Sequence, residues 1–198
     1  MWRFVPQPGR EVGLNILECP DAQPVSPELR EQLLEPFISA ANLTLTELAH
    51  TEPVVRSVYR TALPRTLGDV SAVLGLTAKG GEVLVLSFPA ATASALAERI
   101  LAEVEQVPDD ELVRDCMGEL ANVIAGQAKT LLAETPYQLI LATPVVLSGP
   151  GLEVGARPGV ESLNVVFASD CGDFALQVCL EWDQTNGAEP ANDGELVH

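Results

Sequence analysis

Residues Asp110 to Leu132 read DELVRDCMGELANVIAGQAKTLL, and hydrophobic residues recur along them with the period of an α-helix. Asp109 stands where a helix cap is expected, because its carboxylate can accept hydrogen bonds from the exposed amides of the first turn. Two acidic residues follow in that turn and complement the positive end of the helix dipole. The sequence therefore predicts a long helix that begins at Asp110.

One face of this helix is polar. At 3.6 residues per turn, offsets of four and three residues bring Asp115, Glu119 and Asn122 onto one face, and Gly126 and Lys129 extend it. We call these five residues the polar row. The opposite face is expected to lie in the core and consists of Val113, Cys116, Leu120, Ile124 and Leu131, with Met117 and Val123 on its flanks. The polar row is then either a solvated surface or a site that meets a partner.

The first half of the chain changes from helical to strand periodicity. Ser26-Pro27-Glu28 forms a helix start, and Pro36 is expected to kink that helix or to divide it into two segments. The β-branched and alternating runs that follow predict three strands, at Val54 to Arg60, Val70 to Ala78 and Glu82 to Phe88. The turn Lys79-Gly80-Gly81 is expected to join the last two strands as a hairpin.

The alanine-rich segment from Pro89 to Glu103 is amphipathic and predicts a helix before the central one. Beyond Pro136, three further strands are expected near Leu139 to Leu147, Ser162 to Ala168 and Asp173 to Trp182. The glycine-rich residues Ser148 to Gly159 are expected to form a connecting loop.

The two halves of the chain repeat each other. The segment Ile38 to Leu45 matches Ile124 to Leu131, and each half reads as a helix followed by three strands. Runs of strands between helices predict an α+β fold, with a sheet of about six strands and the long helices on one face. In the register of the repeat, the first three members of the polar row correspond to Leu29, Leu33 and Pro36. The polar row is therefore not something that the fold requires.

We expect one domain, over residues 26–183. Residues 1–25 contain four prolines and only a short apolar patch, which predicts a partly disordered extension. Residues 184–198 are polar and acidic, and this tail is expected to be disordered.

The composition argues against several classes of function. The net charge is −17 and the eleven Lys and Arg residues are scattered singly, so nucleic acids and anionic membranes would be repelled. The four cysteines form no C-x-x-C pair and have no histidine at ligand spacing, so no metal site is expected. No stretch has the length and apolar character of a membrane span or a secretion leader, which predicts a soluble cytoplasmic protein.

An asparagine in the middle of a helix has an amide that can donate to one oxygen and accept from another, and so can position a water molecule. A carboxylate one turn away can pair with a cation on a partner. Taken alone, the pair Glu119 and Asn122 also suits a solvated helix face, because these residue types are common there.

A family resemblance adds to this reading. The spacing Asp115-x-x-x-Glu119-x-x-Asn122, followed by IAG, AKTLL and then Pro144 in TPVVLSG, resembles the CheX group of the CheC, CheX and FliY chemotaxis phosphatases. SAVLGLTAKGGEVLVLSF before the central helix and FALQVCLEW near the end are similar to strand pairs of the same family. The resemblance covers residues 26–183 and implies a CheC-like fold.

The resemblance implies a protein phosphatase that removes phosphate from the phospho-aspartate of a CheY-type response regulator. In that interpretation Asn122 orients the attacking water and Glu119 pairs with the lysine of the receiver domain. Asp115, Gly126, Lys129 and Pro144 then contribute to binding the receiver. Magnesium is expected in the receiver, with no cofactor bound by this chain.

Two further implications follow from the same resemblance. Because the first half carries Leu33 and Pro36 at the motif positions, a single site is expected. Relatives of the CheX group form homodimers through exchange of sheet elements, which makes a homodimer an expectation here. The alternative function is a binding module that docks a receiver or a flagellar-switch component without turnover.

Overall fold

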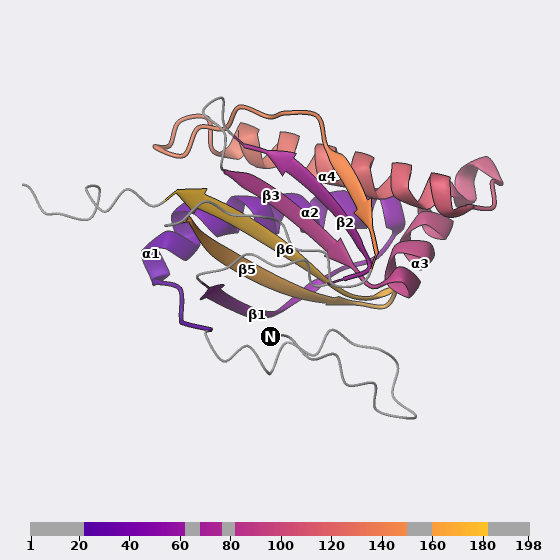
Figure 1. Cartoon of the computed structure of the whole chain (residues 1–198), viewed down its shortest axis with the longest axis horizontal. Helices are drawn as coiled ribbons and strands as arrows, with labels where there is room; N and C mark the ends of the chain where they lie inside the picture. The colour runs from indigo at the N-terminus through magenta and orange to yellow at the C-terminus, as the bar shows by residue number, and fades with distance from the viewer. Residues whose placement is uncertain (1–21, 62–67, 77–81, 150–159, 182–198) are drawn as a thin grey trace, which may run out of the picture.

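The computed structural model describes residues 22–61, 68–76, 82–149 and 160–181 (Figure 1). Six strands form one antiparallel sheet in the order β1-β5-β6-β3-β2-β4. The strands are β1 (Val54–Thr61), β2 (Val70–Gly75), β3 (Val83–Phe88), β4 (Val145–Ser148), β5 (Val160–Ser169) and β6 (Gly172–Glu181). The α+β fold and the six-stranded sheet are as predicted.

Two long helices, α2 (Glu35–Ala49) and α4 (Asp110–Leu131), contact each other and cover one face of this sheet (Figure 1). The shorter α3 (Ala90–Leu101) contacts both and continues into a 3-10 turn at Ala102–Val104. Helix α4 lies over β2, β3 and β4, at the end of the sheet where β4 is the edge strand. The prediction of long helices on one face is confirmed.

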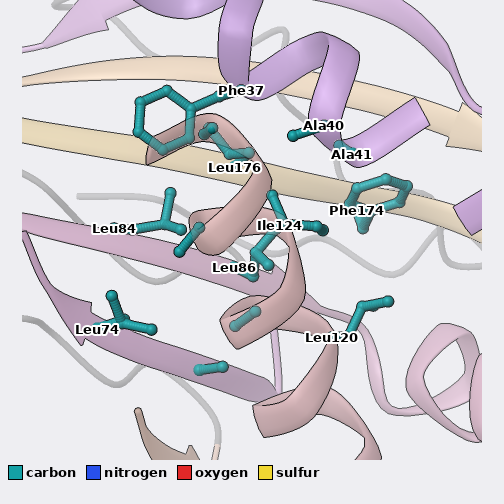
Figure 2. Packing of buried hydrophobic residues seen from close by; sticks show 14 of the residues in the cluster. Phe37, Ala40, Ala41, Leu74, Leu84, Leu86, Leu120, Ile124, Phe174 and Leu176 are labelled. Atoms are coloured by element: carbon teal, nitrogen blue, oxygen red, sulfur yellow. The ribbon is translucent and has the colours of Figure 1, made fainter. Parts of the chain in front are cut away.

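The core lies between these helices and the sheet. Figure 2 shows Phe37 of α2 and Ile124 of α4 facing a layer of leucines from the strands. The ring of Phe174 stacks against Phe167, with centroids 4.8 Å apart, and against Phe88 at 5.5 Å. Since large buried side chains each contribute about 1.5–3 kcal/mol, this layer fixes how α4 sits on the sheet.

The internal duplication is visible in the strand order. If β1, β2 and β3 are exchanged with β4, β5 and β6, the order β1-β5-β6-β3-β2-β4 becomes its own reverse. The third strands of the two halves, β3 and β6, therefore pair at the centre, and the first strands, β1 and β4, form the two edges. Each half contributes one long helix and three strands to a sheet with approximate twofold symmetry.

Pro36 divides the first helical region, as predicted. After the single turn α1 (Pro27–Leu29), residues Arg30–Leu34 form a π-helical turn, and α2 begins at Glu35. The amide of Glu35 bonds to the carbonyl of Arg30, five residues earlier. Because a proline has no amide to donate, the wider turn before it accommodates the missing bond.

The apolar face of α4 differs from its prediction in two positions. Leu131, expected in the core, is 55% exposed, whereas Met117, expected on a flank, is fully buried. Leu131 is the last residue of α4, and the fully buried Leu132 that caps the helix occupies the core position in its place. Cys116 is half-buried at the margin of this face.

The strand predicted at residues 139–147 is shorter and starts later, as β4. Residues 139–144 belong to no strand, and among the described residues they donate two backbone hydrogen bonds to the end of β2 and the residue after it. The amide of Ile140 donates to the carbonyl of Leu76, and the amide of Ala142 donates to that of Gly75, each at 2.9 Å. Pro144 lacks an amide and interrupts the ladder just before Val145.

Several predictions lie outside the described residues. They concern residues 1–21 of the expected extension, the turn at 79–81, most of the expected loop at 148–159, and the tail at 184–198. Within the described part of the extension, Gln23 forms a bridge with Arg60 and Val25 packs against the core. Among the described residues, no helix is long and apolar enough to cross a membrane.

Candidate functional site

A groove with a volume of about 890 Å³ runs between α4 and the extended chain that leads into β4. It is open to solvent. Three members of the polar row stand on its α4 side, and Pro144 stands on the opposite side. The lining residues are Arg114, Asp115, Gly118, Glu119, Asn122, Leu141, Ala142, Thr143, Pro144 and Val146.

Helix α4 presents the polar row from a fixed position. Its N-cap residue, Asp109, accepts hydrogen bonds from the amides of Glu111 (3.1 Å) and Leu112 (2.9 Å), as the sequence predicted. Caps of this kind contribute about 1 kcal/mol to helix stability. The opposite face of α4 carries buried residues from Val113 to Ala128, which prevents the helix from turning about its axis. The side chains in the row are therefore held by a rigid element.

The second wall of the groove comes close to α4 because Gly118 has no side chain. A Cβ atom added there would lie 3.1 Å from Cγ2 of Val146, which is tighter than ordinary contact. In the same way, a Cβ at Gly75 of β2 would lie 3.3 Å from Cβ of Ala142. These two glycines set how near the segment of residues 141–146 lies to the helix and to the sheet.

The structure brings together four of the six residues that the sequence singled out. Asp115, Glu119 and Asn122 are exposed, and they share the groove with the half-buried Pro144. Gly126 and Lys129 do not line the groove; they continue the row toward the C-terminal end of α4. In the described part of the chain, no atom lies within 4 Å of a Cβ atom built at Gly126.

Sequence reasoning missed the remaining lining residues, and Arg114 among them is the one with a charge. Arg114 is adjacent to Asp115 in sequence, but successive residues point about 100° apart around a helix, so the spacing rule did not include it. Gly118 could have been found from the sequence, since a glycine inside a helical pattern often marks a point where another segment packs closely against the helix. Leu141 and Thr143 are uncharged and form no motif with the row.

The groove combines two carboxylates, one amide and one guanidinium. Asp115 also affects its neighbour in the chain: burial, and next the charge of Asp115, raise the pKa of the Cys116 thiol above its usual value. The thiol is therefore poorly suited to act as a nucleophile at neutral pH. Among the described residues, no three His, Cys, Asp or Glu side chains are grouped so as to hold a metal ion. The arrangement suits docking and the placement of a water molecule.

The corresponding positions in the first half of the chain have a different environment. Leu33, which matches Glu119 in the repeat, is fully buried. Leu29 and Pro36 are half-buried, and Leu29 packs against the core. The π-helical turn of residues 30–34 passes through these positions. Within the described chain the duplicated fold therefore carries the polar row in its second half, where α4 presents it to solvent.

Comparisons with known proteins agree with the fold. Residues 70–168, half of the chain, match the model of the family described as chemotaxis phosphatase CheX, and this range includes every residue that lines the groove. No functionally curated protein matches the sequence.

Three solved structures illustrate the similarity. A chemotaxis protein CheX from Desulfovibrio desulfuricans is 28% identical, with a TM-score of 0.65, over 74% of this chain and 97% of that one. A chemotaxis protein CheX from Vibrio vulnificus is 26% identical, with a TM-score of 0.61, over 74% and 97%. A CheX from Borrelia burgdorferi, solved in complex with CheY, BeF3 and Mg²⁺, is 22% identical, with a TM-score of 0.54, over 74% and 95%, and shares the fold. With the match to the family model, these likenesses show that the chain belongs to the CheX family of chemotaxis phosphatases.

Proposed function

We propose that this protein removes the phosphoryl group from the phospho-aspartate of a CheY-type receiver domain that docks on the groove face of α4. The observation that carries the proposal is the exposure of Glu119 and Asn122, one helical turn apart, on a helix whose opposite face is locked in the core. Membership of a family described as chemotaxis phosphatases supports the reaction class. The Borrelia burgdorferi relative, solved with CheY, supports the partner class.

Asn122 is assigned the placement of the attacking water. Its amide can accept a hydrogen bond from the water and donate another to a phosphoryl oxygen, which orients the water for in-line attack. The water oxygen bonds to phosphorus while the bond from phosphorus to the aspartate oxygen breaks. The products are the aspartate carboxylate and inorganic phosphate, which takes up the oxygen and hydrogen of the water.

Glu119 is assigned to docking at the same site. Residues three apart on a helix have Cβ atoms about 5–6 Å from each other, so Glu119 can pair with a receiver lysine while Asn122 reaches the phosphoryl group. Phosphoryl transfer needs mainly positioning and charge neutralisation, which the receiver's Mg²⁺ and lysine would supply. This chain then adds one oriented water to a site that is otherwise complete.

The remaining predicted residues are assigned to receiver binding. Asp115 and Pro144 stand on the two sides of the groove, where a docked receiver would contact both. Gly126 leaves open space one turn beyond Asn122, which allows a partner backbone to approach α4 closely. Lys129 is exposed near the end of the row.

The proposal is tested with a CheY-type receiver that has been phosphorylated in the presence of Mg²⁺. Phosphate loss should be faster with the wild-type protein than without it, and Glu119→Gln should raise KM because the ion pair to the receiver lysine is lost. A rate of phosphate loss unchanged by the wild-type protein, combined with measurable binding, would leave the alternative of a docking module without turnover. If the wild-type protein neither binds the receiver nor speeds phosphate loss, the phosphatase and the docking module are both contradicted.

A further inference from the structure

Arg114 lines the groove and has no side-chain partner among the residues that the structure describes. It belongs to α4, is half-buried, and lines the groove together with Asp115, Gly118 and Glu119. Within the described residues it forms no ion pair or hydrogen bond through its side chain. A half-buried guanidinium is expected to find an acceptor, because it carries five donors in a fixed plane.

The other arginines in the described part of the chain all pair with carboxylates. Arg30 bonds Glu35 at 3.0 Å, and Arg56 bonds Asp173 at 2.5 Å. The two other pairs are Arg60 with Glu161 (3.4 Å) and Arg99 with Asp170 (2.8 Å). In a chain with a net charge of −17, an unpaired arginine in a groove is the exception.

Arg114 is too far from Asn122 to act on the same group. Eight residues separate the two positions, which corresponds to about 12 Å along the helix axis. A phosphoryl group oriented by Asn122 would therefore lie beyond the guanidinium. Arg114 would instead meet a part of the partner outside the phosphorylation site, at the N-terminal end of the groove.

We infer that Arg114 is a specificity-determining residue that binds a surface carboxylate of the receiver next to its phosphorylation site. The inference rests on the proposed function. It adds to the pair between Glu119 and a receiver lysine a second pair of reversed charges, between Arg114 and a receiver carboxylate. The distance between the lysine and the carboxylate on the receiver would then have to match the distance between Glu119 and Arg114. Receivers lacking that carboxylate would be poor substrates, because like charges or unpaired groups at an interface disfavour the wrong partner.

The test is steady-state dephosphorylation of a phosphorylated CheY-type receiver by Arg114→Ala and Arg114→Glu. We expect kcat/KM to fall about tenfold for alanine and further for glutamate, while kcat at saturating receiver stays within about twofold of wild type. Arg114→Lys should recover part of the loss, since it keeps the charge but loses the planar fork. The salt dependence of kcat/KM should also become weaker in Arg114→Ala.

Arg30→Glu serves as the matched control. It changes the net charge by the same amount as Arg114→Glu and breaks only an exposed pair, but it lies on the π-helical turn, away from the groove. Its kcat/KM should equal that of wild type. If Arg30→Glu and Arg114→Glu lower kcat/KM equally, a general charge effect explains both and the assignment of Arg114 is wrong.

A rescue experiment identifies the contact. Each surface carboxylate around the phosphorylation site of the receiver is changed in turn to lysine, and one such receiver should restore activity with Arg114→Glu. Activity of Arg114→Ala equal to that of wild type would overturn the inference while leaving the proposed function intact.

If the wild-type protein does not speed phosphate loss, its binding to the receiver loaded with BeF3 and Mg²⁺ tests the Arg114 contact separately from the phosphatase function. If Arg114→Glu then binds this receiver about tenfold more weakly than wild type does, the inferred contact of Arg114 is supported. If the two proteins bind with equal affinity, the inferred contact is wrong. If wild type does not bind the receiver, the inferred contact and the proposed function are both wrong.

Discussion

Asn122 and Gly126, like Gly118, are residues of α4 that the helix itself does not favour. An asparagine inside a helix costs a few tenths of a kcal/mol relative to better helix formers, and a glycine costs about 1 kcal/mol relative to alanine. Asn122 is exposed, and none of the described residues lies within 4 Å of a Cβ atom built at Gly126. Neither residue is explained by packing within the chain, whereas both fit a surface that receives a partner.

Replacing Gly126 by alanine should therefore stabilise the free protein. The new methyl group meets open space and the helix gains about 0.5–1 kcal/mol, which for a chain of this size raises Tm by about 1–4 °C. If a receiver backbone approaches α4 at this point, the same variant should lower kcat/KM. Thermal unfolding and dephosphorylation assays measure the two effects separately, and a lower Tm for Gly126→Ala would show that the fold itself needs this glycine.

At the scale of elements, the groove depends on the contact between α4 and β4. Gly118 and Val146 meet at the point where a Cβ on the helix would be 3.1 Å from the strand side chain. The spacing of the two elements is therefore set by the smallest possible residue on α4. A larger side chain at this position has to push β4 and the residues before it away from the helix.

Gly118→Val should destabilise the protein by about 1–3 kcal/mol through overpacking, although valine has the better helix propensity. Val146→Ala in the same chain should recover part of that loss, because it removes the atom that the new side chain meets. Denaturant unfolding of the two single variants and the double variant gives the coupling energy. Strictly additive effects would contradict a direct contact between the two positions.

Asp170 ties three elements together at the far end of α3. Arg99 of α3 binds it, with one bond at 2.8 Å, and the hydroxyl of Thr51, just after α2, donates to the same carboxylate. The Arg99 bond first, and the Thr51 bond second, lower the pKa of Asp170 from its ordinary 3.8. A depressed pKa means that the stabilisation is complete above pH 3.8 and is lost as the pH falls through the lower value in the folded protein.

Asp170→Asn should accordingly lower Tm at pH 7, and its deficit relative to wild type should shrink as the pH falls below 3.8. Thermal unfolding of both proteins across this range is the measurement. The effect should be modest, because the pair is exposed and screened by solvent. If the Tm of Asp170→Asn lies below that of wild type by the same amount at pH 7 and in acid, the charge of Asp170 does not contribute to stability.

For the whole molecule, periodicity and caps predicted most of the architecture. The start of α4 at Asp110 followed from Asp109, and the division of the first helix followed from Pro36, because both act through local backbone bonds. The duplication predicted two equivalent halves, and the strand order has that symmetry. The homodimer and the cytoplasmic location stay predictions.

What the sequence did not predict depends on contacts between distant segments. The groove exists because residues 141–146 lie against α4, and this placement depends on Gly118 and on Gly75 of β2. Leu131 was predicted to be buried by period alone, but the helix ends there and Leu132 enters the core instead. Arg114 entered the site through the same tertiary placement, 100° around the helix from its neighbour Asp115.

The central claim is that Asn122 positions water on a receiver that the rest of the groove binds. Asn122→Ala is expected to fold like wild type and to bind a receiver loaded with BeF3 and Mg²⁺ with an affinity within about twofold, since docking uses other side chains. Its single-turnover rate of phosphate loss, measured with saturating protein, should fall by about 10²-fold or more, the usual effect of removing one group that acts on the transition state. A rate for Asn122→Ala equal to that of wild type would contradict the claim.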